Sequence, residues 1–234
     1  MRITYNELIT ITDKCLNALK FPVGETDRIA GMVADLELAG FDGLKMFLNS
    51  IKKINTNSVD ITIKQTNDNT IDIDLKNSSV IFHLPSIMYY ARQRLKYQDS
   101  ITMNITNAYG RWLAYGELKK IAERGFNVHA HWGRRKVDEA VEYFLSSGNK
   151  HPDLYVSNEK QELSILKINI SKTSFKQDVN GRHISSNELM EKTNTSICDG
   201  VEVDENIWNE LYEIAKLGLV ENSETSEAQG AGGV

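Results

Sequence analysis

The chain has 234 residues, of which 41% are hydrophobic and 25% are charged, so it has ample material for a folded core. Its formal net charge of −5, with lysines and arginines spread along the chain, argues against nucleic acid or an anionic membrane as the main partner. Because no apolar run approaches the roughly 20 residues of a membrane helix, and MRITYNELIT lacks the apolar stretch of a secretory signal, we expect a cytoplasmic protein.

Helical periodicity dominates the first fifty residues. Apolar side chains recur three or four positions apart over residues 5–19, and a break at residues 21–24 precedes a second helix that ends near Gly40. A third, short helix is expected over residues 44–51. We therefore predict an N-terminal helical segment spanning residues 1–54.

The apolar period then changes from that of a helix to that of a strand. Residues 59–63 and 71–75 alternate between apolar and polar side chains, and Asn67-Asp68-Asn69 between them predicts a hairpin turn. The stretch SSVIFHLP predicts a further strand that ends at Pro85, and residues 86–96 are expected to be helical.

Residues 100–147 contain the most regular pattern of the chain. SITMNIT predicts a strand, WLAYGELKKIAER a helix, FNVHAHW a strand and KVDEAVEYFLSSG a helix, and this order implies a parallel pair with a right-handed crossover. Residues 163–170 add a strand and residues 204–217 a last amphipathic helix. The expected fold class is α+β or α/β: the helical segment, then a mixed sheet with a parallel β-α-β-α unit at 100–147. A mixed α/β domain would span 55–220, with a flexible Gly-rich tail at 221–234.

Both strand-to-helix junctions of this unit turn through Gly-Arg. Ligands of open α/β sheets bind beyond the carboxyl ends of the strands, and an arginine beside a helix N-terminus is unfavourable unless an anion is bound there. We therefore expect a shared site for a carboxylate or phosphate. Its candidate substrate-binding residues are Asn107, Tyr109, Gly110, Arg111, Gly133, Arg134 and Arg135. The alternative is that these arginines are ordinary loop charges, with Arg134 or Arg135 paired to Asp138 or Glu139. Neither GxGxxG nor GxxxxGK[ST] is present, so no cofactor is identified.

His129 and His131 lie on one face of their predicted strand. Either imidazole could act as a general acid or base beside a bound anion, so both are candidate catalytic residues. The pair could also reach one metal ion with His83, His151 or Asp153 as a third ligand. Nothing in the sequence ties those three residues to the pair, and a polar strand face explains it equally. We therefore predict no metal site.

The two ends of the chain resemble an uncharacterised bacterial family, one of the numbered domains of unknown function. That family opens with Ser-Leu-Asn-Glu, then Lys-Ala and Pro-Trp-Gly followed by acids, and closes with Pro-x-Ser/Thr-Glu-x-Ser-Arg and Gly-Ala-Gly. Val23 and Glu227 depart from this pattern, standing where the family has Trp and Arg. The resemblance implies no known activity. The matching positions are Asn6-Glu7, Lys14, Pro22, Gly24-Glu25, Ser223-Glu224-Thr225-Ser226 and Gly230-Ala231-Gly232.

The first fifty residues also resemble the N-terminal helices of the malate/L-lactate/sulfolactate dehydrogenase family. In that family a helix ends in Ala-Asp-Leu-x-Gly-x-x-Ser-His-Gly, to which VADLELAGFDGLKMF is similar. Asp42-Gly43 stands where Ser-His-Gly would be, so the catalytic histidine of the family has no counterpart here. The resemblance implies a shared fold and does not by itself imply activity.

These observations support three functional hypotheses. The first is an enzyme of small-molecule metabolism that binds an anionic metabolite, although the sequence leaves open whether the chain is catalytic. The second is a non-catalytic partner subunit that docks on another enzyme through the amphipathic helices of residues 5–53 and 204–217; a homo-oligomer is also compatible. The third is a relic of an NAD-dependent hydroxy-acid dehydrogenase.

Overall fold

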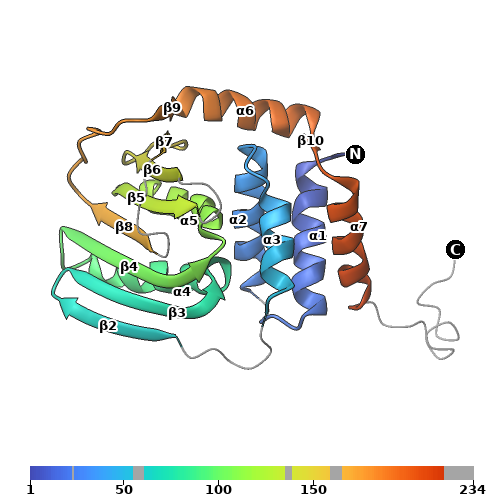
Figure 1. Ribbon diagram of the computed structural model, residues 1–234, viewed down its shortest axis with the longest axis horizontal. Helices are drawn as coiled ribbons and strands as arrows, with labels where there is room; N and C mark the ends of the chain where they lie inside the picture. The colour runs from blue at the N-terminus through green and yellow to red at the C-terminus, as the bar shows by residue number, and fades with distance from the viewer. Residues whose placement is uncertain (23, 55–60, 135–138, 159–164, 219–234) are drawn as a thin grey trace, which may run out of the picture.

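The computed structural model describes residues 1–22, 24–54, 61–134, 139–158 and 165–218. Within them, eight strands form one mixed sheet, flanked on one side by a layer of helices (Figure 1). In sheet order the strands are β2 Thr62–Asn67, β3 Thr70–Ser79, β4 Ser100–Tyr109, β8 Leu166–Ser171, β5 Asn127–Arg134, β6 Glu139–Leu145, β7 Asp153–Ser157 and β9 Arg182–Ile184. Two short strands, β1 Arg2–Ile3 and β10 Val201–Glu202, pair separately.

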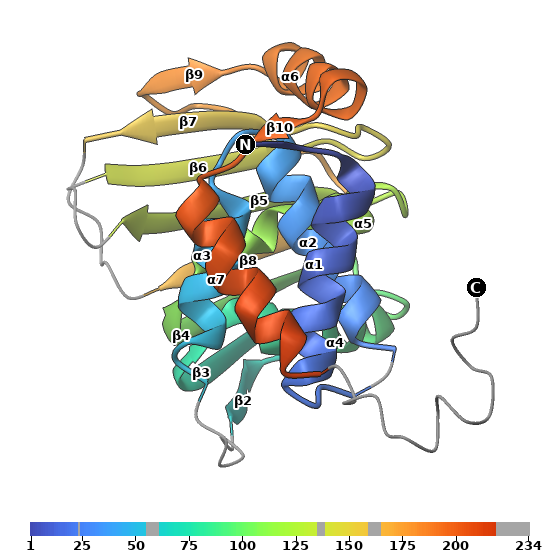
Figure 2. The same cartoon turned by 90° about the vertical axis from the view of Figure 1, so that its right-hand side faces the viewer.

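The helices lie on one face of this sheet, with α1, α2, α3 and α7 in front of the strands when the molecule is viewed from the helical side (Figure 2). They are α1 Tyr5–Ala18, α2 Thr26–Leu38, α3 Gly43–Ile51, α4 Val80–Arg94, the 3-10 turn η1 Arg111–Leu113, α5 Ala114–Ala122, α6 Ser186–Asp199 and α7 Glu205–Lys216. None of the described helices is long and apolar enough to cross a membrane.

The predicted helical N-terminus and the predicted mixed α/β class are confirmed. α1 begins after Thr4, whose side chain and that of Glu7 form a reciprocal capping box, and α7 begins after Asp204, which accepts a hydrogen bond from the backbone N–H of Asn206. The hairpin is confirmed as β2 and β3, which pair antiparallel. The positions predicted for the C-terminal tail lie outside the described residues.

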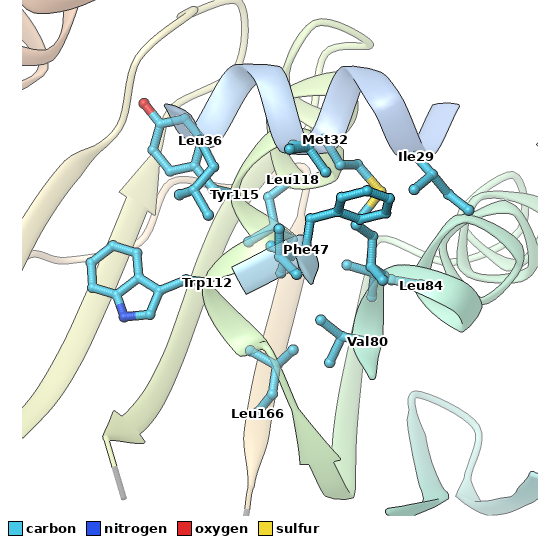
Figure 3. Packing of buried hydrophobic residues seen from close by; sticks show 14 of the residues in the cluster. Ile29, Met32, Leu36, Phe47, Val80, Leu84, Trp112, Tyr115, Leu118 and Leu166 are labelled. Atoms are coloured by element: carbon cyan, nitrogen blue, oxygen red, sulfur yellow. The ribbon is translucent and has the colours of Figure 1, made fainter. Parts of the chain in front are cut away.

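The core lies between the helices and the sheet. Alternate residues of the central strands, such as Ile168 and Ala130, are buried beneath the helical layer. Figure 3 shows how the layers meet: Ile29, Met32 and Leu36 of α2, Phe47 of α3, Val80 and Leu84 of α4, Tyr115 and Leu118 of α5, Trp112 of η1 and Leu166 of β8 belong to one cluster. Because both the helices and the sheet contribute side chains to this cluster, packing holds the helices against the strands.

Two predicted elements are wrong. In SSVIFHLP only Ser78 and Ser79 are strand, as the end of β3. Residues 80–85 begin helix α4, because the apolar residues Val80, Leu84, Ile87 and Ala91 continue a helical stripe past Pro85. KVDEAVEYFLSSG does not form the second helix of the unit at 100–147: residues 139–145 are strand β6, paired with both β5 and β7. There Val141, Tyr143 and Leu145 alternate toward the core, so the strand period prevails.

The topology between β4 and β5 also differs from a simple parallel pair. β8 lies between them and is antiparallel to both, so β4 and β5 run in the same direction without touching as neighbours. The parallel pair of the sheet is β3 and β4, joined through α4. The element that follows β5 along the chain is strand β6, not a helix. The second Gly-Arg junction therefore stands between two strands.

Candidate functional site

The first Gly-Arg junction folds as a turn that points into the protein. Gly110 has a φ of +66°, and a Cβ atom there would lie 2.9 Å from Ser79 Oγ, so glycine permits this close approach. Arg111 is 8% exposed, and its Nη1 donates a hydrogen bond of 2.7 Å to the carbonyl oxygen of Gly133. The guanidinium therefore ties the two junctions together.

The flanking candidates at this junction also have partners in the protein. Asn107, in the left-handed region with a φ of 49°, donates a hydrogen bond to Asp74 Oδ1. Tyr109 is half-buried, which raises its pKa, and the ammonium group of Lys53 lies 5.0 Å from its ring centroid. These two side chains stabilise the end of β4.

The second junction closes strand β5. Gly133 and Arg134 are its last two residues, and Arg134 stands opposite Glu139 in the β5–β6 register. The candidate Arg135 lies outside the described residues. The hydrogen bond from Arg111 thus brings the two junctions together, but a helix follows only the first of them.

A hollow of about 210 Å³ lies beside the start of β6, which follows this junction. It adjoins a wider depression of about 600 Å³ that shares Glu139, Val156 and Arg182 with it. Within the described residues, the Arg182 side chain has neither a hydrogen-bond nor an ion-pair partner. The lining residues of the smaller hollow are Gly40, Phe41, Asp42, Met46, Trp112, Glu139, Val156, Arg182 and Ile184.

Aromatic packing and a backbone turn shape this hollow. The rings of Phe41 and Trp112 stack with their centroids 4.7 Å apart. Asp42 precedes α3 with a φ of 50°, and a side chain at Gly43 would collide with the carbonyl oxygen of Val33 at 2.4 Å. The turn therefore holds Asp42 at the wall. Arg182 was not a candidate in the sequence, because it follows a long polar stretch without periodicity.

The two histidines lie on the opposite face of the sheet from the buried core. Registers across the seven strands from β3 to β9 place one row of side chains on this open face: Asp72, Asn104, Lys167, His131, Glu142, Tyr155 and His183. His129 lies in the next row, whereas Ala130 and Trp132 between the histidines are buried in the core. Because Val156 and Arg182 pair in the row of Trp132, the sheet separates the histidines from the hollow.

His129 has a partner at each ring nitrogen. Its Nε2 lies 2.6 Å from Glu142 Oε2, and its Nδ1 lies 3.4 Å from the side-chain nitrogen of Asn169. The imidazole stacks on Phe144 with a centroid distance of 4.4 Å, and Phe175, from the connection between β8 and β9, lies 5.6 Å away. These contacts fix the orientation of the ring.

His131 and Glu142 complete a group of three potential metal ligands. Burial lowers the pKa of His131, and the neighbouring Glu142 opposes this shift. One ligand atom from each of His129, His131 and Glu142 lies within 4.8 Å of the other two. The sequence did not point to Glu142, because residues 136–148 were predicted as a helix, where it would not face the histidines.

The residues considered as a third ligand lie elsewhere. His83, on α4, is within 2.8 Å of Ser78 Oγ. Asp153 Oδ1 instead lies 2.9 Å from His183 Nε2. His151 belongs to the turn before β7, where burial lowers its pKa.

A further groove of about 280 Å³ runs between α1 and α7 on the outer surface of the helical layer. Trp208 is partly buried there and Tyr212 is 50% exposed. The groove is lined by Asn6, Glu7, Thr10, Ile11, Lys14, Trp208, Tyr212, Ala215 and Lys216.

Comparison with known families gives one match. Residues 3–85 match a family described as a protein of unknown function (DUF3726). This confirms the expected resemblance to an uncharacterised family over the N-terminal part of the chain. No curated protein matches the sequence.

Solved structures with the same fold include several dehydrogenases. A malate dehydrogenase from Pyrococcus horikoshii OT3 is 12% identical, with a TM-score of 0.67 over 95% of this chain and 97% of that one. A sulfolactate dehydrogenase from Methanocaldococcus jannaschii is 13% identical, with a TM-score of 0.65 over 94% and 98%. A delta1-piperideine-2-carboxylate reductase from Pseudomonas syringae pvar. tomato is 7% identical, with a TM-score of 0.61 over 92% and 99%. The expected dehydrogenase resemblance is thereby confirmed at the level of the fold.

Proposed function

We propose that the protein acts in small-molecule metabolism and binds a small carboxylate that carries a 2-hydroxy or 2-amino group, in the hollow beside Asp42. One observation carries the proposal: the Arg182 guanidinium, which forms no hydrogen bond or ion pair within the described part of the chain and has Glu188 as an electrostatic neighbour, shares the walls of this hollow with Asp42 and Glu139. The likeness to enzymes named for malate, sulfolactate and piperideine-2-carboxylate supports the same class of ligand.

The lining residues match the two ends of such a ligand. A guanidinium fork binds a carboxylate through two parallel hydrogen bonds. The carboxylates of Asp42 and Glu139 accept hydrogen bonds from a hydroxyl or ammonium group, and Trp112 supplies apolar contact. Arg111 has a structural role in this proposal, because its hydrogen bond to the Gly133 carbonyl positions the neighbouring Trp112 in the wall of the site. Arg182 then binds the anion, the role expected of the Gly-Arg junctions.

The relic hypothesis would require a nicotinamide cofactor, but the acid–base group that the dehydrogenase resemblance implies does not fit this chain. Asp42-Gly43 stands at the position of the dehydrogenase histidine, and none of the chain's five histidines lines the hollow in the described structure. His129 and His131 lie across the sheet from it. We therefore derive no hydride-transfer step.

Calorimetric titration with malate, lactate, alanine and inorganic phosphate tests the proposal. We expect one of the carboxylates to bind the wild type, and Arg182→Ala to weaken that binding by at least about tenfold, since a charge-assisted bond contributes roughly 1.5–3 kcal/mol. Arg124→Ala removes an exposed arginine far from the hollow and serves as the matched control. Arg134→Ala tests the original junction hypothesis separately.

Equal affinities of the Arg182→Ala variant and the wild type would reject the role of Arg182. If none of the three carboxylates binds, the proposal itself fails, whether or not phosphate binds. A parallel NADH fluorescence titration addresses the relic hypothesis, which requires a change in emission on binding.

A second candidate function rests on the groove between α1 and α7. A partner enzyme that docks there would bury Tyr212 and Trp208, as expected for aromatic anchors of an interface. A stoichiometric partner recovered from a native lysate with the wild type and lost with Trp208→Ala would support this function. Recovery of a second copy of the chain alone would instead indicate a homo-oligomer.

A further inference from the structure

We propose that His129, His131 and Glu142 form a binding site for a divalent transition-metal ion on the open face of the sheet. This site is independent of the hollow and of the proposed function, because the sheet lies between them.

The strand register brings the three side chains together. His131 is paired directly with Glu142, and His129 is two residues away on the same face of β5. β5 lies between β8 and β6 and is hydrogen-bonded to both. The ligands are therefore mounted on strands that cannot shift independently, and little ordering is needed when a metal ion binds.

The donor set has the chemistry of known transition-metal sites. Two imidazoles and one carboxylate bind zinc in catalytic sites and ferrous iron in facial triads, and in both cases positions remain open for water or substrate. Each donor offers one atom within 4.8 Å of the other two, and the side chains are half-buried. An ion would replace the present 2.6 Å contact between His129 Nε2 and Glu142.

The surroundings include the outer-shell support that metal-binding histidines usually have. The side-chain amide of Asn169 lies against Nδ1 of His129, and with its oxygen turned toward the ring it would accept a hydrogen bond from Nδ1–H. Phe144 and Phe175 flank the same ring and limit water access. The Thr102 hydroxyl now donates to the Asn169 side-chain oxygen at 3.0 Å, and in the turned orientation it would accept a hydrogen bond from the amide nitrogen instead.

One neighbouring charge opposes cation binding. Lys167 stands opposite His131 on β8, and its ammonium group is among the charges that act on that imidazole. Removing this charge while leaving the three ligands intact should therefore tighten metal binding. A variant that is merely misfolded would bind the metal ion less tightly, so a higher affinity after removal of the Lys167 charge supports a specific site.

The test is isothermal titration of the full chain with Zn²⁺, together with Co²⁺ absorption spectra. We expect one equivalent to bind. His131→Ala and Glu142→Gln should each weaken binding by more than the roughly 10–100-fold typical of losing an outer-shell partner, and Lys167→Gln should strengthen it. Circular dichroism verifies that each variant is folded.

His183→Ala is the matched control. His183 also contacts a carboxylate, Asp153 Oδ1 at 2.9 Å, but these two do not belong to a group of three ligands in the described residues. Its loss should leave the affinity unchanged. The proposal is overturned if the wild type does not bind Zn²⁺, if His131→Ala binds as tightly as the wild type, or if His183→Ala loses as much affinity as His131→Ala.

Discussion

Arg111→Met provides a direct test of how the two Gly-Arg junctions are held together. The substitution keeps an unbranched apolar side chain in a site where the arginine is 8% exposed, and it removes the guanidinium that donates to the Gly133 carbonyl at 2.7 Å. A hydrogen bond from a charged donor contributes about 1.5–3 kcal/mol to the free energy of unfolding. In the variant the Gly133 carbonyl oxygen has lost this donor, so that contribution is lost. That range is a net contribution, so it already includes the cost of burying the charge.

We therefore expect Arg111→Met to lower the free energy of unfolding by about 1.5–3 kcal/mol. For a chain of this size, that corresponds to a fall in Tm of about 3–12 °C. Urea unfolding followed by circular dichroism measures the first quantity, and calorimetry measures the second.

Arg124→Met, on the exposed surface, should stay within about 0.5 kcal/mol of the wild type. If Arg111→Met is equally neutral, the Arg111–Gly133 contact does not stabilise the junctions. The case for Arg111 as a residue of the wall would then be lost.

Three further predictions concern the helical layer. Burial raises the pKa of Glu37, so the folded state disfavours its ionisation; as the pH rises above the ordinary value of 4.5, the wild type should lose unfolding free energy relative to Glu37→Gln. Parallel slopes in denaturant titrations between about pH 5 and pH 7 would contradict this. Burial also raises the pKa of Cys15 to about 12, so Ellman's reagent at about pH 8 should label only Cys198 in the native protein and both thiols in denaturant; rapid native labelling of both would refute the burial. Gly43→Ala should destabilise the protein by about 1–3 kcal/mol, because the added methyl group would clash with the Val33 carbonyl oxygen. Gly31→Ala should instead stabilise it by up to about 1 kcal/mol, because Gly31 has open space around it in α2. Thermal melts of the two variants measure both effects.

Local patterns were sufficient for the elements whose periodicity is unambiguous. α1 and α7 follow from apolar spacing and caps, α2 and α3 from apolar spacing, and the β2–β3 hairpin from alternation around a turn. α6 carries an equally local signal in the sequence, the Ser185–Glu188 capping box. The failures over 80–85 and 139–145 are short apolar runs, where helical and strand periods fit equally well and tertiary contacts decide.

The candidate sites depended on information that spacing does not carry. Glu142 meets the histidines only because residues 139–145 form a strand beside β5. Arg182 lines the same hollow as Asp42 only because β9 is the last strand in the order of the sheet. The pairing of two histidines on one strand face was visible in the sequence. The residues that complete each site come from other strands, and one sequence does not reveal which strands become neighbours.

The position of β8 has a consequence for how the chain is made. During synthesis β4 ends at residue 109, yet the strand that occupies its free edge begins only at residue 166. Until that segment emerges from the ribosome, two apolar strands have unpaired backbone edges, the condition under which nascent chains aggregate. Closing the gap is a non-local event, so its loop-closure entropy should govern the rate of folding. Truncations that stop short of residue 166 are therefore expected to depend on chaperones.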